Sequence, residues 1–425
     1  MMNISRSRLF RGLLSTSLLL LAIFASGCGS DSSPVTPANP GLLISSDLIK
    51  TFESSDFERV RTSELEDFFR TATKSASDYR SGLVSTYKKV ALYRVAYESV
   101  IPELGNQRVV GYGLVAIPEG AANGTPVVSY QHGTVFGKDE APSNIEKSME
   151  TKLALLQFAS QGYIVVAADY FGNGPMSTVP NSYFVKGSSE QAMFDMHTAS
   201  MAFLKKNNIT PGKLFLLGWS QGGYNTLLHF RMLEKANIPV AGVATASGPG
   251  DPSRGLLRSL FARRSFDAAF SAPATTNMIF ALEYYYKLAN CSKLFIRQDS
   301  NRYETAQKFY EFKAEFSEYL SVGGYSIDSI FTPDFFSTAK TKSHPFWELI
   351  SQAESYRWLS QAPLRQYYSD RDEVVPADLG KIAVDYQTGL GKTNATSHDA
   401  GANADHRCVY VHTLVDVKPW FDSLK

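Results

Sequence analysis

The most reactive arrangement in this sequence is centred on Ser220, which lies between Gly218 and Gly222. An apolar run of strand length at residues 213–217 precedes them and an apolar pattern with helical spacing follows, so Ser220 is expected on a sharp strand-to-helix turn. The two glycines give such a turn the small neighbours that it needs, and the helix start would direct free backbone N–H groups toward an oxyanion. The spacing arises by chance in roughly one chain in seven of this length, so other residues must support a serine nucleophile.

A nucleophilic serine needs a histidine base and a carboxylic acid that orients the base. In an architecture of this kind, the acid and then the base follow the serine along the chain. An acidic turn with Asp370 and Asp372 follows a strand-like run at residues 364–368, and either aspartate could instead cap that turn. His406 lies between the last expected strand, near residues 393–398, and the last expected helix, from about Val409 to Leu424. The other histidines after Ser220 are His229, His344, His398 and His412.

These segments resemble the α/β-hydrolase superfamily. That superfamily keeps its acid in a turn ahead of a Val-Pro pair, here Val375 and Pro376, and this alignment implies that Asp372 is the acid, with Asp370 as the alternative. It keeps its base between the last strand and the last helix, which implies that His406 is the base.

Residues 130–134, Tyr-Gln-His-Gly-Thr, resemble the His-Gly oxyanion segment of the same superfamily. The resemblance implies that the backbone N–H of Thr134 joins that of Gln221 in binding an oxyanion. His132 is expected to brace this loop rather than to act as a base.

Further segments resemble bacterial and fungal secretory lipases and related esterases. They are residues 169–174, residues 180–183 and the helix that holds Asp195. The resemblance runs from about Val90 to the C-terminus, with a looser match over the expected insertion. It implies a serine hydrolase that cleaves carboxylic esters, with an ester or lipid as the small-molecule substrate. An acyltransferase, a peptidase and a non-catalytic surface binding protein are alternatives on the same fold.

The elements needed to position these residues predict an α/β-hydrolase fold over residues 88–425. Short apolar runs alternate with helical patterns, which predicts a mostly parallel central sheet with helices on both faces. Two runs, residues 90–97 and 108–118, predict antiparallel strands at the edge of the sheet. Residues 249–360 break the alternation with clustered aromatic residues and predict a helical lid or cap insertion. Residues 42–87 predict a partly helical N-terminal extension.

Charge and motif content exclude several classes of function. The 425 residues carry a formal net charge of +1, so nucleic acid is not an expected partner. Cysteine and histidine spacing predicts no metal site, and neither a Gly-rich phosphate loop nor a dinucleotide-binding fingerprint occurs. We therefore expect no cofactor.

The N-terminus predicts export. Three arginines in residues 6–11 precede an apolar run at residues 13–24, which is typical of a secretory signal and too short to span a membrane. The following Ala-Ser-Gly-Cys resembles the lipobox of bacterial lipoproteins, which implies lipidation at Cys28 after removal of residues 1–27. Ordinary cleavage nearby, with Cys28 as a spare thiol, is the alternative. Gly29 favours an outer-membrane or cell-surface location.

Residues 28–41 are rich in Ser, Pro, Gly and Asn and predict a flexible tether between anchor and domain. Only Cys291 and Cys408 remain beyond the tether. In an exported protein they could form a disulfide or remain two buried thiols, and the sequence does not favour either.

Overall fold

The computed structural model describes residues 38–425 except residues 177, 268–269, 300 and 324–325. Among these residues, nine strands form one sheet in the order β1-β2-β3-β5-β4-β6-β7-β8-β9. Strands β1, β2 and β3 are antiparallel to their neighbours, and the strands from β5 to β9 in this order are parallel. The bounds are β1 Leu43–Phe52, β2 Val90–Ile101, β3 Gln107–Pro118, β4 Val127–Gln131, β5 Ile164–Ala168, β6 Leu214–Trp219, β7 Gly242–Ala246, β8 Leu364–Tyr368 and β9 Ala395–Asp399.

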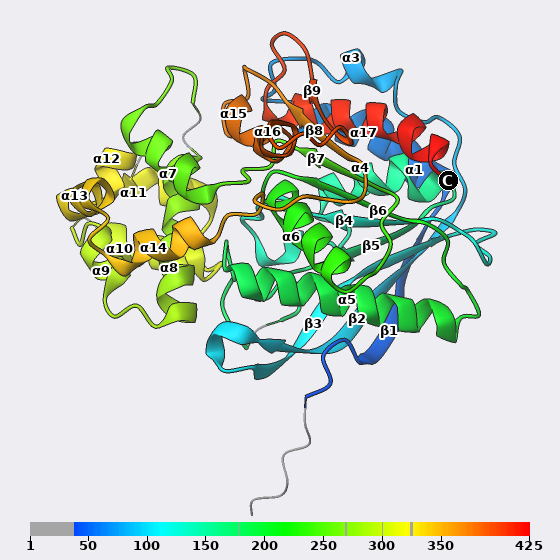
Figure 1. Cartoon of the computed structure of the whole chain (residues 1–425), viewed down its shortest axis with the longest axis horizontal. Coiled ribbons are helices and arrows are strands. Elements are labelled where there is room, and N and C mark those ends of the chain that lie inside the picture. Colours follow the sequence, from blue (N-terminus) through cyan, green and yellow to red (C-terminus); the bar gives the residue numbers. More distant parts are fainter. Residues whose placement is uncertain (1–37, 177, 268–269, 300, 324–325) are drawn as a thin grey trace, which may run out of the picture. The chain divides into compact units, whose positions relative to one another are not determined.

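Helices pack on both faces of the sheet. Alternate side chains of each strand point to opposite faces, so the two faces form two separate hydrophobic cores. In β6, Leu214 and Leu216 pack into one core and Phe215 and Leu217 into the other. Helices α5 (Lys186–Lys206) and α6 (Gln221–Lys235) contribute to the first core, and α4 (Met149–Gln157) and α17 (His406–Ser423) to the second. The helices thus lie on both faces (Figure 1), which confirms the predicted fold class.

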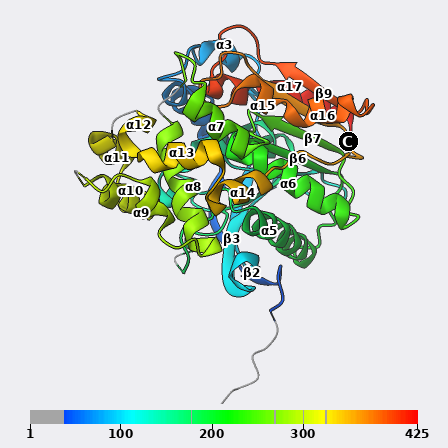
Figure 2. The same ribbon diagram turned by 60° about the vertical axis from the view of Figure 1, so that its left-hand side comes forward.

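A helical segment separates β7 from β8 and projects beside the sheet, as Figure 2 shows with this side brought forward. Its helices are α7 Pro252–Phe261, α8 Ser271–Tyr286, α9 Cys291–Phe295, α10 Arg302–Tyr310, α11 Phe316–Gly323, α12 Ile327–Ile330, α13 Pro333–Thr341 and α14 Pro345–Gln352. We call this segment the cap. Two cap hydroxyls hold it to a loop of the sheet domain: Tyr285 donates to the carbonyl of Pro180 at 2.7 Å and Tyr310 to that of Asn181 at 2.8 Å.

The N-terminal segment contains a strand in addition to the helices of the expected partly helical extension. Its first part is β1, the edge strand, which pairs with β2 and makes β2 and β3 interior strands rather than edge strands. Two register shifts interrupt β1, so its apolar residues do not alternate regularly and no strand pattern is visible in the sequence. The rest of the segment is helical: α1 Ser54–Arg59, a π-helical turn Val60–Glu64, α2 Leu65–Phe68 and α3 Ser77–Arg80.

The remaining short helices connect the main elements. They are the 3₁₀ turns Pro102–Leu104, Lys138–Glu140 and Ala159–Gln161, and the helices α15 Ala377–Gly380 and α16 Ile382–Gly389. Helix α17 begins at His406, three residues before the expected start at Val409, because Asp405 caps it by accepting the Cys408 N–H at 2.9 Å. His406 therefore lies on the first turn of a helix and not in the preceding loop.

The sequence also led to expectations about the cysteines, the N-terminal signal and metal binding. Within the described residues, Cys291 and Cys408 are free and buried thiols, so the disulfide alternative is wrong for this structure. Cys28, the signal segment and nearly all of the tether lie outside the described residues. In the part of the chain that is described, no helix combines the length and apolar character needed to cross a membrane. Those same residues contain no group of three or more His, Cys, Asp or Glu side chains that could hold a metal ion.

Candidate active site

The carboxyl ends of the parallel strands bring the predicted site residues to one edge of the sheet. Strand β4 ends at Gln131, directly before the predicted oxyanion segment, and β6 ends at Trp219, directly before Ser220. Strand β8 ends at Tyr368, a few residues before Asp372. In parallel sheets, this edge is where ligands bind.

Ser220 occupies a strained turn that depends on its small neighbours. Its φ of 57° and ψ of −123° are uncommon for a residue with a side chain, and its N–H donates to the Ala246 carbonyl at 2.9 Å. A Cβ on Gly222 would lie 1.9 Å from the carbonyl oxygen of Gln131, and one on Gly218 would lie 2.3 Å from that of Gly222. Only glycine at these positions allows the strand, the turn and the helix to approach so closely.

His406 and Asp372 form a buried pair. The Nδ1 atom of His406 lies 3.0 Å from Oδ2 and 3.1 Å from Oδ1 of Asp372. Asp372 is completely buried, and His406 is 6% exposed. A carboxylate at Nδ1 favours the tautomer that carries its proton there, which leaves Nε2 free to accept a proton.

Other donors fix the Asp372 carboxylate in place. The Ser247 hydroxyl donates to Oδ2 at 2.5 Å, and the N–H groups of Val374 and Val375 donate to Oδ1 at 2.9 and 2.8 Å. Burial by itself raises the pKa of Asp372, but the charge of His406 and these hydrogen bonds lower that pKa overall below its usual value. Asp372 is thus held as an anion.

The same pair shifts the titration of the imidazole in the opposite direction. Burial by itself lowers the pKa of His406, but the charge of Asp372 and its hydrogen bond raise that pKa overall above the usual value. Trp219 orients the residue further: its ring lies 4.9 Å from the imidazole between centroids, and its Nε1–H donates to the His406 carbonyl at 3.1 Å. Asp372 and Trp219, at the end of β6, therefore both fix the orientation of the imidazole.

Ser220 and His406 line one hollow of about 710 Å³, together with Thr134 of the predicted oxyanion segment. Gln221 is the first residue of α6. Its backbone N–H is one of the first four of the helix, which have no carbonyl acceptor within the helix. His132 is buried, and its ring nitrogens lie 2.7 Å from the Gly133 carbonyl and 3.2 Å from the Asp169 carbonyl. Burial lowers the pKa of His132 to about 4. It therefore stays neutral between these carbonyl groups.

Glu150 is a residue of this site that the sequence analysis missed. It lines the same hollow from α4, and its Oε1 accepts the Gly133 N–H at 2.7 Å and the Tyr130 hydroxyl at 2.9 Å. Burial raises the pKa of Glu150 to about 7. Glu150 thus fixes the residue next to Thr134 and adds a carboxyl group that titrates near neutral pH.

The comparisons with known proteins extend over the same elements. A search of curated proteins found no match. The model of the prolyl oligopeptidase family matches residues 148–245. Among solved structures, the chain is similar to the rice cell wall degrading esterase LipA from Xanthomonas oryzae, with 20% identity, a TM-score of 0.77, and coverage of 91% of this chain and 100% of that one. A putative hydrolase from Legionella pneumophila gives 20% identity, a TM-score of 0.76 and coverage of 89% and 98%.

Candida antarctica lipase A is a third similar structure, with 16% identity, a TM-score of 0.63 and coverage of 91% of this chain and 83% of that one. The protein has the α/β-hydrolase fold. Within that fold, the residues matched by the prolyl oligopeptidase family run from the start of α4 to β7. They include Ser220 and Glu150 but neither Asp372 nor His406.

The rejected candidates lie in other surroundings. Asp370 is exposed, whereas Asp372 is buried against the imidazole. His398 lies 2.9 Å from the Thr396 hydroxyl and stacks on the Tyr367 ring. His229 is completely buried in α6, and His344 caps α14 by accepting the Phe346 N–H. His412 lies within α17, well past its first turn.

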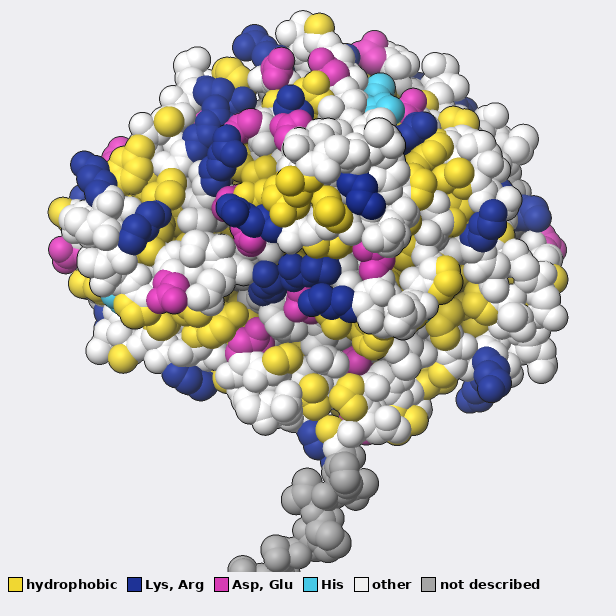
Figure 3. Space-filling model, viewed as in Figure 1, with side chains coloured by type: hydrophobic (Ala, Val, Ile, Leu, Met, Phe, Trp, Pro, Cys, Tyr) yellow, Lys and Arg dark blue, Asp and Glu magenta, His cyan; other side chains and the backbone are white. Residues whose placement is uncertain are grey.

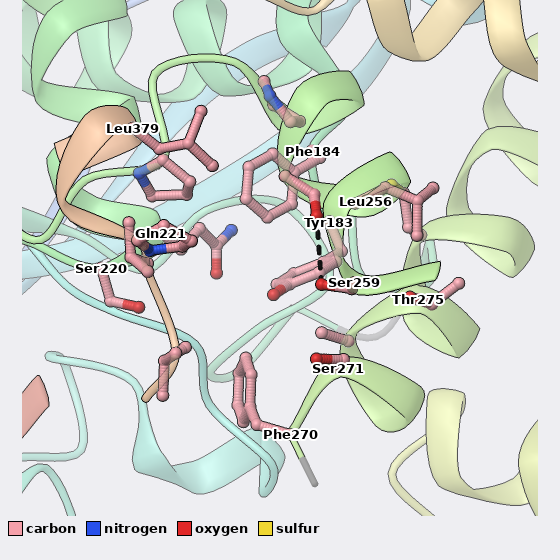
Figure 4. A pocket seen from close by; sticks show the side chains of 18 residues that line it. Tyr183, Phe184, Ser220, Gln221, Leu256, Ser259, Phe270, Ser271, Thr275 and Leu379 are labelled. Carbon is pink, nitrogen blue, oxygen red and sulfur yellow. Dashed lines mark hydrogen bonds between the residues drawn. The ribbon is translucent and has the colours of Figure 1, made fainter. Parts of the chain in front are cut away.

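A second cavity reaches Ser220 from the side of the cap. Figure 4 shows Ser220 and Gln221 on one side of it and Leu256 and Thr275, from α7 and α8, on the opposite side. Its volume is about 90 Å³, much smaller than that of the hollow shared with His406. The nucleophile candidate therefore lies between two cavities of unequal size.

Surface charge is mixed on one face of the molecule. On the face of the molecule shown in Figure 3, Lys and Arg side chains lie next to Asp and Glu side chains, with hydrophobic side chains between them.

Proposed function

We propose that the protein is a serine hydrolase that cleaves carboxylic esters. The observation that carries this proposal is the combination of Ser220 on a positive-φ turn with His406 in the same hollow, where Asp372 holds the imidazole by Nδ1. The esterase and lipase among the similar structures support an ester as the substrate class.

In the proposed reaction, the Ser220 hydroxyl oxygen attacks the acyl carbon while Nε2 of His406 takes its proton. The backbone N–H groups of Thr134 and Gln221 bind the oxyanion of the tetrahedral intermediate. The bond from the acyl carbon to the alcohol oxygen then breaks, and His406 protonates the departing alcohol. Water repeats the sequence on the acyl-enzyme, which releases the acid and restores Ser220. These steps require no cofactor.

Two other enzymatic reactions use the same groups. In an acyltransferase, an alcohol instead of water attacks the acyl-enzyme. The product is then a new ester, whose amount rises with the concentration of that alcohol. A peptidase is favoured by the prolyl oligopeptidase family match over residues 148–245. A non-catalytic binding protein would keep the fold without assembling the triad.

The test is reaction of the purified full-length protein with a fluorophosphonate probe and with p-nitrophenyl butyrate. We expect both to be lost in Ser220→Ala, with turnover reduced on the order of a millionfold. Ser397→Ala changes an exposed serine on β9 and serves as the matched control. Labelling and turnover that survive in Ser220→Ala would exclude this serine as the nucleophile, and cleavage of peptides in preference to esters would favour the peptidase.

We also propose that the protein is exported and held at a membrane by a lipid on Cys28. The support is the sequence of residues 1–28, in which basic residues, an apolar run and small residues precede the cysteine. Two or more acyl chains would anchor the protein stably, whereas a single chain would bind reversibly.

A further inference from the structure

The two cavities that meet at Ser220 differ in size and in the atoms that line them. The smaller, about 90 Å³, is walled mainly by apolar side chains that include Phe184, Leu256, Met278 and Leu379. The larger, about 710 Å³, has charged groups in its wall from Glu140, Lys147, Glu150, Glu373 and Arg407. An ester bound across Ser220 would place its acyl part in one cavity and its alcohol part in the other.

The position of His406 decides which part occupies which cavity. The departing alcohol oxygen must lie within hydrogen-bond reach of the imidazole that protonates it. His406 lines the larger cavity and is not part of the wall of the smaller one. The alcohol part therefore belongs in the larger cavity, and the acyl chain belongs in the smaller one beside Gln221.

The smaller cavity limits the length of the acyl chain. A dry cavity of about 150 Å³ holds a benzene molecule, so about 90 Å³ has room for an acyl group of roughly two to four carbons. The wall opposite Ser220 is firm, because Leu256 of the cap is only 5% exposed. Leu379 of α15 lies on the Ser220 side of the cavity in Figure 4 and is 1% exposed. The hydrogen bonds from Tyr285 and Tyr310 fix the cap, which supplies the wall opposite Ser220, to the sheet domain.

The larger cavity combines volume with polar groups. The Glu373 carboxylate accepts the backbone N–H of His406 at 3.0 Å, and the Glu140 carboxylate accepts the backbone N–H of Phe136 at 2.9 Å. Both carboxylates therefore have fixed positions in the wall of the larger cavity. Arg407 stacks on Phe68, which places a cation beside an aromatic surface there. Such a wall can bind a large alcohol that carries several hydrogen-bonding groups.

We propose that the substrate is a short-chain acyl ester of a large polar alcohol. This proposal rests on the proposed ester hydrolase function and specifies its substrate class. It predicts that the enzyme discriminates against long acyl chains and favours long polar alcohols over methanol.

The acyl part is tested with full-length protein and the p-nitrophenyl esters of acetate, butyrate and octanoate. Because one methylene that does not fit can cost tenfold or more in kcat/KM, we expect octanoate to be hydrolysed at least about tenfold less efficiently than butyrate. Leu256→Ala should raise the octanoate-to-butyrate ratio by about tenfold. Leu257→Ala is the matched control, because Leu257 is the next residue of α7 and lines a different hollow.

A filling variant keeps this test decisive if Leu256→Ala does not fold. Ala274 lines the small cavity from α8, so Ala274→Phe should lower butyrate turnover about tenfold relative to acetate. Octanoate turnover equal to that of butyrate, in protein that the fluorophosphonate labels at Ser220, would overturn this inference and leave the hydrolase function standing. Absence of both labelling and hydrolysis would instead contradict the function itself.

The alcohol part is tested with butyrate esters of methanol, 1-octanol and triethylene glycol monomethyl ether. We expect the glycol ether ester to give the highest kcat/KM, at least about tenfold above the methyl ester, since it can use the polar wall. Equal values for the methyl and glycol ether esters, or a preference for the octyl ester, would overturn the assignment of a large polar alcohol.

Discussion

At the scale of single residues, the Asp372 carboxylate is the most constrained group of the candidate site. It accepts hydrogen bonds from a hydroxyl, two backbone N–H groups and the imidazole, and no water is needed to satisfy it. Because these donors hold it as an anion, it raises the affinity of His406 for a proton. The contact between Asp372 and His406 therefore sets the fraction of His406 that is neutral, and so able to accept a proton, at a given pH.

This contact predicts the pH dependence of the enzyme. The base must be neutral to act, so kcat/KM should fall as the pH drops through the raised pKa of His406. Asp372→Asn removes the charge that raises this pKa, so the acid limb should move to lower pH while activity falls about 10⁴-fold. The measurement is kcat/KM for p-nitrophenyl butyrate between about pH 5 and 9.

Asp370→Asn is the control for this pH profile, because Asp370 is the alternative acid and is exposed. We expect its profile to match that of the unmodified protein. A shift of the acid limb in Asp370→Asn and not in Asp372→Asn would reverse the assignment of the acid.

Glu150 provides a second prediction at this scale. Glu150→Ala leaves the Gly133 N–H without its acceptor next to Thr134, the proposed oxyanion donor, so kcat should fall about tenfold or more with little change in KM. Glu150→Gln keeps an oxygen that can accept from Gly133 and Tyr130 and should restore most of kcat at pH values above 7, where the native carboxyl is ionised. A Glu150→Ala variant with unchanged kcat would show that the loop needs no such support.

Sequence reasoning predicted the candidate reacting groups but missed the groups that support them. Ser220, Asp372 and His406 follow strands in a recognisable order, and the structure brings Asp372 and His406 into contact and places Ser220 in a hollow that His406 also lines. Glu150 and Ser247 carry no local signal. Their roles depend on contacts with residues far away in the sequence. Such contacts cannot be predicted from the spacing of residues along the chain.

At the scale of elements, the turn between β6 and α6 depends on close backbone packing. Strand β4 runs parallel to β6, with Gln131 paired to Gly218, and this pairing brings the Gln131 carbonyl against the start of α6. The same pairing places the predicted oxyanion segment beside Ser220, the candidate nucleophile. The register of two strands therefore sets the relative position of two functional groups.

A methyl group at Gly222 tests this packing. Since its Cβ would lie 1.9 Å from the Gln131 oxygen, Gly222→Ala should lower the free energy of unfolding by about 3 kcal/mol and reduce kcat severely. Gly389→Ala is the matched control, because that helical glycine has open space around its Cβ position. Urea unfolding of both variants measures the difference, and equal stability would mean that the turn tolerates a side chain.

Elements with regular patterns were predictable and irregular ones were not. The strand before Ser220 and the helix after it match the expected positions, since both have continuous apolar patterns. Strand β1 was missed because of its two register shifts. The start of α17 was placed three residues late, although Asp405 ahead of an apolar run is a capping signal that predicts the correct start.

At the scale of the whole molecule, the residues that bear the site form one compact unit from Ala38 to Lys425. All the proposed catalytic and substrate-binding groups belong to this unit. Chemistry and membrane attachment should therefore be separable, because the proposed lipid site at Cys28 precedes the unit in the sequence.

This separation predicts the behaviour of Cys28→Ala in cells. Without the thiol no lipid can be attached, so the variant should lose labelling by a palmitate analogue and move from the membrane fraction to the soluble fraction. Its kcat/KM for p-nitrophenyl butyrate should stay unchanged, since the compact unit is intact. Cys291→Ala is the matched control: it removes a buried thiol from the cap and should keep both the label and the membrane location. If Cys28→Ala stayed in the membrane fraction, attachment would have to come from another part of the chain, and the lipoprotein interpretation of the N-terminus would be wrong.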